Sequence, residues 1–303
     1  MIDLTVIILT FNEEIHIRRC IEGVSSIARQ IVVIDSESTD RTVDIAKSLG
    51  AEVYSHKWPG NQAEQFNWAI DNVKINSPWI LRLDADEYLS EDLKTEIEQR
   101  LPSLDANVSG VVLPLSNIWM GRELKHGGSK IGILRIFRRG KGRYGARKMD
   151  EHIEIMSGDI VNFEHPFVDD NLNNFSWWTN KHIGYAIREA AELLDLEYGF
   201  SITRDEKDNL CKEAQIRRKR KEKYARQPLF WRAFAYFVFR YFIKGGFLDG
   251  KEGFLRHFLQ GWWYRTLVDA NIYQIKRRCC NDAGRIKECL EKDYGIRFNW
   301  GSA

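Results

Sequence analysis

The sequence predicts an α/β protein in which a largely parallel sheet is covered by helices, followed by a helical C-terminal region. Short apolar runs without polar alternation recur through the first hundred residues, as in strands that are buried on both faces. Segments with helical spacing separate these runs, which is the element order of a doubly wound sheet. The 303 residues are 44% hydrophobic and 29% charged, a globular balance with enough length for a sizeable core.

The N-terminal elements alternate regularly between strand and helix. Strands are expected at 4–9, 31–34, 51–55 and 79–83, and helices at 14–25, 39–49, 62–73 and 91–101. From 109 to 162, short apolar runs and Gly-rich turns predict further strands, and 175–196 has the spacing of one long amphipathic helix. We therefore divide the chain into residues 1–108 and 109–204, the two halves of one α/β domain, and a C-terminal region at 205–303.

Charge and cysteine content exclude several classes of protein. The net charge of +2 predicts no polyanionic partner for the chain as a whole. The cysteines are odd in number and form no Cys-x-x-Cys pair, which is typical of a reduced, cytosolic chain without a zinc site. They are Cys20, Cys211, Cys279, Cys280 and Cys289. The N-terminus lacks the basic start of a signal peptide, and no stretch of about eighteen uncharged apolar residues predicts a membrane-spanning helix.

Polar side chains follow the first two expected strands. The first strand ends in Thr10-Phe11-Asn12-Glu13, and the second ends in Asp35 followed by a Ser- and Thr-rich turn. In doubly wound sheets, ligands bind beyond the carboxyl ends of the strands. Asp35 directly follows four apolar residues, and we expect it to contact a ligand. The residues at 38–40 are equally well explained as a cap for the next helix.

Three carboxylates follow the fourth expected strand within four residues. These are Asp84, Asp86 and Glu87, and their mutual repulsion makes a purely structural role uncommon. A divalent cation that bridges to a diphosphate would relieve the repulsion. The alternative is a solvated acidic turn before the helix at 91–101. The position directly after a buried strand, with two other strand-end motifs upstream, favours the metal site.

Together these motifs resemble those of family 2 glycosyltransferases with the GT-A fold, from the first strand to about residue 170. The resemblance implies a Rossmann-like nucleotide-binding sheet and an inverting transfer from a nucleotide diphosphate sugar, with UDP-sugar favoured and Mg²⁺ or Mn²⁺ as cofactor. It places Asp84 at the ribose and sugar and Asp86 at the metal. Its nucleotide-binding positions are Thr10, Asn12, Glu13 and Asp35. Gln65 and Asn67 match a Gln-x-Asn on the donor side, and a polar helix N-terminus explains them equally well.

An inverting transfer needs a base that takes the proton of the acceptor hydroxyl. By the resemblance, an Asp or Glu well after the metal motif supplies it. We favour Glu151, and Asp150, which stands where many relatives have His, is the other candidate. His152 and His165 are candidates for metal or diphosphate contact, although a lone His is more often structural. A basic stretch either meets the phosphates or forms a solvated face; it consists of Lys130, Arg135, Arg138 and Arg139.

The C-terminal region combines charge with aromatic side chains. Residues 212–226 carry eight basic and two acidic residues, and 230–247 hold nine aromatics. The region could bind nucleic acid, but it has no recognisable nucleic-acid-binding fold. It could be a buried helical subdomain, or it could lie in an anionic membrane interface. Arg232, Arg240 and Lys244 interrupt the apolar segment, which favours interfacial over spanning, and 244–250 resembles the tail of bacterial lipopolysaccharide core enzymes.

The sequence as a whole predicts a cytoplasmic glycosyltransferase, peripheral on the inner face of the cell membrane and without a nucleic-acid partner. Its acceptor would be a glycan or a lipid-linked glycan in surface polysaccharide or lipopolysaccharide synthesis. A nucleotidyltransferase is the competing enzyme, but it would carry a Gly-rich basic loop where Thr10-Phe11-Asn12-Glu13 stands. A non-catalytic sugar-nucleotide-binding module is the other alternative, and against it every expected carboxylate is present.

Overall fold

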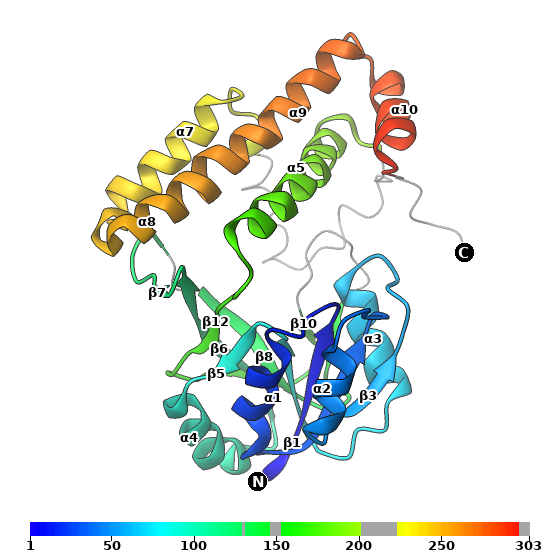
Figure 1. The fold of residues 1–303 in the computed structure, drawn as a ribbon, viewed down its shortest axis with the longest axis vertical. Coiled ribbons are helices and arrows are strands. Elements are labelled where there is room, and N and C mark those ends of the chain that lie inside the picture. Colours follow the sequence, from blue (N-terminus) through cyan, green and yellow to red (C-terminus); the bar gives the residue numbers. More distant parts are fainter. Residues whose placement is uncertain (129–130, 146–152, 201–222, 297–303) are drawn as a thin grey trace. The chain divides into compact units, whose positions relative to one another are not determined.

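The computed structural model describes residues 1–128, 131–145, 153–200 and 223–296. It divides into two compact units, Met1–Leu172 and Asn173–Ala303 (Figure 1). The first unit is an α/β sheet and the second is helical, so the predicted fold class is confirmed. The division falls after residue 172, whereas the change in composition had placed the C-terminal region after residue 204.

The first half of the sheet has the predicted alternation of strands and helices. Its elements are β1 (Ile2–Thr10), α1 (Ile17–Ser25), β2 (Ala28–Asp35), α2 (Thr42–Ser48), β3 (Glu52–Ser55), α3 (Gln62–Asn72) and β4 (Trp79–Asp84). β1 pairs in parallel with both β2 and β4, and β2 pairs in parallel with β3. Each element begins or ends within a few residues of its predicted position.

The second half of the unit adds mostly antiparallel strands. β5 (Glu87–Leu89) comes first along the chain, and α4 (Glu91–Arg100) and η1 (Leu101–Ser103) separate it from the remaining strands. The strands are β6 (Val108–Trp119), β7 (Arg122–Glu123), β8 (Ile131–Arg138), β9 (Gly142–Tyr144), β10 (Ile153–Ile155), β11 (Asp159–Asn162) and β12 (Phe167–Asp169). The main sheet has the order β3-β2-β1-β4-β8-β6-β12-β5, and β9 pairs with β10 separately. β6 is twelve residues long, so the prediction of only short strands here was wrong in this respect.

Two apolar clusters cover the two faces of the sheet. The alternation of side chains along β1 sends Leu4 and Ile8 to one face and Ile7 to the other, and all three are fully buried. The first face packs against α1 and α4, and the second packs against α3. On the second face Phe66 of α3 meets Phe137 edge-on, with ring centroids 6.1 Å apart. Burial on both faces explains why the N-terminal strands read as unbroken apolar runs.

The second unit is built from helices. They are α5 (Phe175–Tyr198), α7 (Trp231–Val238), the π-helix η3 (Phe239–Ile243), η4 (Gly246–Asp249), α8 (Gly250–Arg256), the π-helix η5 (His257–Trp263), α9 (Tyr264–Arg278) and α10 (Ala283–Tyr294). Ala186 and Ala190 on α5 let α9 approach closely and bury Val268 and Ile272. Within the described residues, no helix combines the length and the apolar character that crossing a bilayer requires.

A buried ion pair joins α7 to α9. The carboxylate of Asp269 accepts hydrogen bonds from Arg232 Nε at 2.8 Å and from the Phe230 backbone N–H at 2.7 Å. Arg232 also donates to the carbonyl oxygen of Ala225 at 2.9 Å, and both charged side chains are buried. Arg232 was one of three basic residues that indicated an interfacial segment, and for this residue the interpretation was wrong.

Asp269→Ala should destabilise the helical unit by about 3–5 kcal/mol, because the Arg232 guanidinium would stay buried without its carboxylate. Urea unfolding followed by circular dichroism measures this loss. The double variant Arg232→Met with Asp269→Leu should recover most of it, since no charge is left uncompensated. Lys292→Ala, which breaks an exposed pair with Glu288, is the control and should unfold at the same urea concentration as wild type. A loss below about 1 kcal/mol in Asp269→Ala would contradict the structural role of the pair.

Candidate active site

The carboxyl ends of three neighbouring parallel strands meet at one edge of the sheet. In the strand register, Thr10 lies opposite Asp35 and Leu9 lies opposite Asp84. The loops after β1, β2 and β4 therefore start side by side. Ligands bind at this edge in open α/β sheets. The structure thus brings together most of the predicted site; these residues are Thr10, Asn12, Glu13, Asp35, Asp84 and Asp86.

Asp35 ties the first two strand ends together. Its Oδ1 accepts hydrogen bonds from the Thr10 hydroxyl at 3.0 Å and the Ser38 hydroxyl at 2.5 Å. Its Oδ2 accepts the Ser38 backbone N–H at 2.8 Å. The residue is buried, so these bonds fix the direction of its carboxylate. Its contact with a nucleotide stays a prediction.

The loop after β1 is bonded to the loop after β2. Asn12 has a positive φ of 57°; its N–H donates to Ser38 Oγ at 2.8 Å and its Oδ1 accepts the Thr39 N–H at 2.8 Å. The Glu13 N–H donates to Thr42 Oγ1 at 2.8 Å. These bonds hold both loops in one conformation at the edge of the sheet, before any ligand arrives.

Asp40 performs the capping role that was one alternative for this segment. Its carboxylate accepts the Thr42 N–H at 2.9 Å, at the start of α2, and the Glu14 N–H at 3.1 Å. Burial raises the pKa of Asp40, but the hydrogen bonds from Thr42 and Glu14 outweigh it, so the pKa lies below its ordinary value.

His16 connects the loop after β1 to the segment after β12, and the sequence analysis did not identify it. Its ring is fully buried, with Nδ1 2.5 Å from Glu13 Oε2 and Nε2 accepting the Leu172 backbone N–H at 2.8 Å. A backbone amide can only donate, so Nε2 carries the lone pair and the ring proton sits on Nδ1, directed at Glu13. The buried ring thus orients the Glu13 carboxylate.

The same segment reaches the acidic loop after β4. Asn171 Nδ2 donates to Asp86 Oδ2 at 2.9 Å, and Arg19 Nη1 binds Asp170 Oδ2 at 2.6 Å. The guanidinium of Arg19 also donates to the backbone oxygen of Asp86 at 3.4 Å. Residues 170–172 therefore link the loop after β1 to the acidic loop. These contacts depend on pairs 85 or more residues apart, so no local pattern could reveal them.

Two buried arginines neutralise two of the three clustered carboxylates. Asp84 Oδ1 accepts hydrogen bonds from Arg82 Nη2 at 2.6 Å and from Gln62 Nε2 at 2.9 Å. Glu87 is buried, pairs with Arg135 of β8, and accepts the Asp84 N–H at 2.9 Å. Burial raises the pKa of Asp84, and the charge of Arg82 opposes this shift. Burial is the main cause that raises the pKa of Glu87, and the charges of Asp84 and Asp86 raise it further, so the expected repulsion is present and Arg82 and Arg135 offset part of it from inside the sheet.

Asp86 is the acidic residue that remains available. It is partly exposed, and within the described ranges no Lys or Arg forms an ion pair with its carboxylate. The same ranges hold no group of three His, Cys, Asp or Glu side chains suited to a metal ion. A nucleotide-associated Mg²⁺ usually takes one or two carboxylates together with phosphate oxygens, and a single outward carboxylate fits that requirement. His152, the other predicted ligand, lies outside the described residues.

Gln65 and Asn67 are engaged inside the protein. Gln65 is fully buried, and its Nε2 donates to Ser36 Oγ and to the His56 carbonyl oxygen, both at 3.0 Å. Asn67 exchanges two hydrogen bonds, at 2.9 and 3.1 Å, with the backbone of Tyr144. Their contact with a donor stays a prediction. On α3 it is Gln62, missed by the sequence analysis, that reaches the acidic loop; its position at the start of the helix was the available indication.

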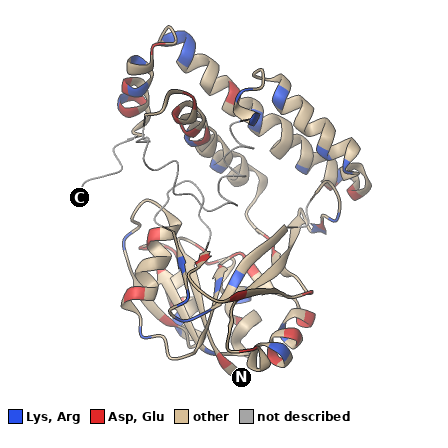
Figure 2. Cartoon of the chain, turned by 180° about the vertical axis from the view of Figure 1, so that it is seen from behind, with Lys and Arg blue, Asp and Glu red and all other residues tan. Residues whose placement is uncertain are grey.

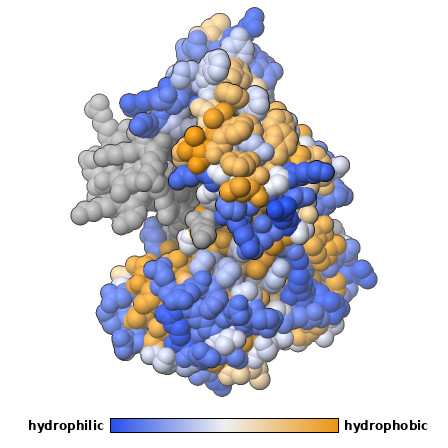
Figure 3. Space-filling view, turned by 90° about the vertical axis from the view of Figure 1, so that its left-hand side faces the viewer, coloured by the Kyte–Doolittle hydropathy of each residue, from blue (hydrophilic) through white to orange (hydrophobic). Residues whose placement is uncertain are grey.

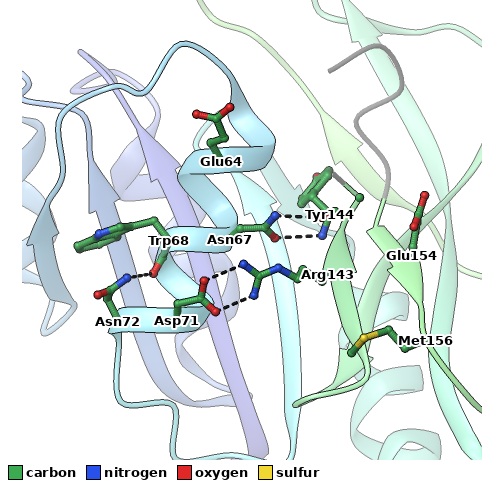
Figure 4. Close-up of a pocket in the computed structure, with 10 residues that line it drawn as sticks. Glu64, Asn67, Trp68, Asp71, Asn72, Arg143, Tyr144, Glu154 and Met156 are labelled. Carbon is green, nitrogen blue, oxygen red and sulfur yellow. Dashed lines mark hydrogen bonds and ion pairs between the residues drawn. The ribbon is translucent and has the colours of Figure 1, made fainter. Parts of the chain in front are cut away.

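A cavity of about 640 Å³ lies between α3 and the β9–β10 hairpin (Figure 4). Arg143 of β9 crosses to α3, where its two terminal nitrogens bind the Asp71 carboxylate at 2.6 and 2.7 Å. Glu154 and Met156 line the cavity from the β10 side. Charged and amide side chains thus line the cavity together with Trp68 and Met156, and it adjoins the strand pair that flanks the predicted base.

The base candidates Asp150 and Glu151 lie outside the described residues, but the strands on either side are described. Tyr144 at the end of β9 pairs with Ile153 at the start of β10. The ring of Tyr144 lies 5.9 Å from the guanidinium of Arg82, which binds Asp84. The segment between the two strands thus begins and ends near the acidic loop.

Other predicted candidates have partners elsewhere in the unit. Arg138 lies opposite Trp79, at the amino end of β4, and its Nε donates to the Val108 carbonyl oxygen at 2.6 Å. Arg139 donates to a backbone carbonyl in the same region. These two arginines therefore lie away from the strand-end edge, whereas Arg135 is buried at the acidic loop against Glu87. His165 Nδ1 lies 2.9 Å from Glu96 Oε2 on α4. Lys130 lies outside the described residues.

Comparison with known protein families gives a match over about half of the chain. The family model described as Glycosyl transferase family 2 matches residues 5–160. An uncharacterized glycosyltransferase of Rickettsia bellii is 45% identical over 91 residues, which is 30% of each chain, so the match spans under a third of that relative. The lipopolysaccharide core biosynthesis glycosyltransferase LpsC of Rhizobium meliloti is 26% identical over 277 residues, 89% of this chain and 92% of LpsC.

One similar solved structure is glucosyl-3-phosphoglycerate synthase from Mycobacterium tuberculosis, crystallised with Mn²⁺, UDP and glucosyl-3-phosphoglycerate. It has a TM-score of 0.31 and 19% sequence identity, and the alignment covers 39% of this chain and 44% of that one.

Asp84→Ala and Asp86→Ala should differ in stability although they remove the same group two residues apart. Asp84→Ala leaves the buried Arg82 without its carboxylate and should cost about 1–3 kcal/mol. Asp86→Ala removes one hydrogen bond from Asn171 and should cost less than about 1 kcal/mol. Urea unfolding in metal-free buffer compares the two variants. Equal losses of stability in the two variants would contradict the assignment of Asp84 to a buried ion pair and of Asp86 to a position held by one hydrogen bond.

Proposed function

We propose that this chain, which belongs to glycosyl transferase family 2, transfers a sugar with inversion from a nucleotide diphosphate sugar, with UDP-sugar favoured, to a glycan or lipid-linked acceptor. One observation carries the proposal. Asp84, the last residue of β4, and Asp86, two residues later, lie at the same edge of the sheet as Thr10 and Asp35, the last residues of β1 and β2. A nucleotide needs a fixed set of polar groups at that edge, and a diphosphate leaving group needs compensation of its charge.

The donor side of the site is rigid before substrate binds. Asp35, Asn12 and Glu13 lie on two loops that their own hydrogen bonds hold together, and they frame the nucleotide. Asp84 is oriented by Arg82 and Gln62 toward the ribose and sugar. Preformed geometry lowers the entropy lost when the reacting groups are brought into line. These roles extend the family resemblance through the contacts of the individual residues.

A bound Mg²⁺ or Mn²⁺ would be held by Asp86, with His152 as the second protein ligand. When bound, the cation supplies positive charge at the diphosphate leaving group. In the described part of the chain no Lys or Arg pairs with the Asp86 carboxylate, and Asn171 Nδ2 holds one of its oxygens at 2.9 Å. Arg82 and Arg135 do not compete for it, since they are buried against Asp84 and Glu87.

Glu151 takes the proton from the attacking acceptor hydroxyl, with Asp150 as the alternative base. The support is the position of the flanking strands: Tyr144 and Ile153 are paired, and Tyr144 lies next to Arg82. In the sequence, Asp150 and Glu151 lie between these two paired strands. An inverting displacement requires the base and the leaving group on opposite sides of the reacting carbon.

The acceptor belongs to surface polysaccharide or lipopolysaccharide synthesis, on the cytoplasmic face of the cell membrane. The similarity to LpsC over most of both chains supports this assignment. The basic segment at 212–226, most of which lies outside the described residues, would contact anionic headgroups. No nucleic-acid partner is proposed. Turnover distinguishes this function from a binding module that keeps the sheet without the chemistry.

The direct test is a thermal-shift screen across UDP-, GDP- and dTDP-sugars with and without Mn²⁺, followed by donor hydrolysis assays. Asp86→Ala should lose both the Mn²⁺-dependent stabilisation and the hydrolysis of the preferred donor, because the diphosphate would lose its cation. Asp92→Ala, an exposed carboxylate in the first turn of α4, is the matched control and should behave like wild type. Near-normal metal-dependent turnover in Asp86→Ala would exclude the metal assignment.

Glu151→Gln keeps the shape of the side chain but cannot accept a proton. Its transfer rate should fall by about 10²–10⁴-fold while donor affinity is largely kept. The comparison variant is Asp150→Asn, measured with the same donor and acceptor. A large loss in Asp150→Asn together with near-normal turnover in Glu151→Gln would assign the base to Asp150.

A further inference from the structure

Six bulky apolar side chains are exposed around the turn that joins η3 to α8. They are Phe239, Phe242, Ile243, Phe247, Leu248 and Phe254, and we call this set the apolar tip. Each is between 43% and 72% exposed. Figure 3 shows apolar side chains gathered over one face of the helical unit. Contiguous apolar surface of this kind on a protein indicates an interaction site.

The turn is built to hold the apolar tip outward. A Cβ on Gly246 would lie 2.4 Å from the ring of His257, and a Cβ on Gly253 would lie 2.5 Å from the Gly246 carbonyl oxygen. Only glycine permits this close crossing of η4 with α8 and η5. Asp249, on the same short helix as Phe247 and Leu248, is buried. The polar side chain therefore points inward while its apolar neighbours face outward, the reverse of a surface turn that is merely solvated.

Exposed lysines flank the apolar tip, whereas Asp249 is buried and Glu252 of α8 is only partly exposed. From Phe230 to Leu248 the sequence holds no Asp or Glu, so the charged residues of α7 and η3 are all basic (Figure 2). Lys244 and Lys251 are exposed. The Lys244 ammonium lies 5.6 Å from the centre of the Phe239 ring, so its stem runs along apolar surface. Long basic side chains in this arrangement place the ammonium at the headgroups while their stems stay in the apolar layer.

We propose that the apolar tip inserts into the headgroup–acyl boundary of an anionic bilayer, with Lys244 and Lys251 on lipid phosphates. Aromatic and aliphatic side chains at a helix turn, with two exposed lysines beside them against one partly exposed carboxylate, Glu252, match the two layers of a bilayer surface. The insertion deepens the proposed function, on which it rests for its purpose, because it would bring the enzyme to a lipid-linked acceptor. The proposal places a membrane contact at residues 239–254, in addition to the contact proposed for the basic segment at 212–226.

Two weak attachments acting together give stable membrane binding, whereas one gives only marginal binding. The two attachments proposed here differ physically. Attraction between exposed basic residues and anionic lipids is screened by salt. Burial of apolar side chains is not screened, so the share of binding contributed by the apolar tip should persist as salt rises.

The test is flotation of the full chain with vesicles of phosphatidylglycerol mixed with phosphatidylcholine. Wild type should float, and a variant that changes Phe242, Ile243, Phe247 and Leu248 to Ser should partition at least about tenfold less at both low and high salt. Its circular dichroism spectrum and Tm check folding, and Ile243→Ser alone, which changes the most exposed of the six, provides a milder variant that should also bind more weakly. The control is Ile160→Ser, which removes a 51% exposed apolar side chain from β11 in the other unit and should float like wild type.

Further arms separate the attachments and the proposed function. A variant with Arg217, Arg218, Lys219, Arg220 and Lys221 changed to Gln should lose only the salt-sensitive part of binding. The proposal is overturned if wild type does not float, or if the variant with four Ser substitutions floats as well as wild type. It is also overturned if that variant changes only a dimer equilibrium, since the occupant would be a second copy. If wild type floats but hydrolyses no nucleotide sugar, the apolar tip stands and the proposed function fails.

Discussion

The ion pairs of Arg82 with Asp84 and of Arg135 with Glu87 hold the acidic loop at the edge of the sheet. Both guanidinium groups are buried beneath the loop, on β4 and β8. A carboxylate that lost its arginine would leave a charge in the interior, which proteins tolerate poorly. The pairs therefore determine which acidic side chain stays inside and which faces out. Among the described residues, Asp86 has a hydrogen bond from the Asn171 amide and no ion pair with an arginine, so its carboxylate suits the binding of a cation.

Around this centre the loops of the first unit are joined to one another rather than left to move separately. Asp35 ties β1 to the turn after β2, and His16 ties the loop after β1 to residues 170–172. That short segment also holds Asp86. The strand ends are therefore connected to one another through hydrogen bonds of their side chains. Such a frame suits a site in which the nucleotide, the sugar and the leaving group must be positioned together.

The charged residues of the helical unit include a buried ion pair and exposed lysines beside apolar side chains. Arg232 and Asp269 form a buried pair that joins two helices, whereas Lys244 and Lys251 stay at the surface beside exposed aromatic rings. The sequence showed Arg232 and Lys244 only as basic residues that interrupt the same apolar segment. Their separation into interior and surface also separates structural stabilisation from the membrane contact that we propose.

The sequence by itself determined the order of strands and helices, and the polar residues that follow each strand. Both depend on local periodicity, which a linear pattern contains, and the resemblance to family 2 glycosyltransferases rests on these same local motifs. Only the tertiary structure decided which of those polar side chains are used by the fold. Glu87 meets Arg135 from 48 residues away, and Asp86 meets Asn171 from 85 residues away. Such pairs form because β8 lies beside β4 and β12 beside β5, an order that local patterns do not encode. The same reason explains why the sequence shows only a cluster of repelling carboxylates, whereas in the protein Arg82 and Arg135 pair with two of the three.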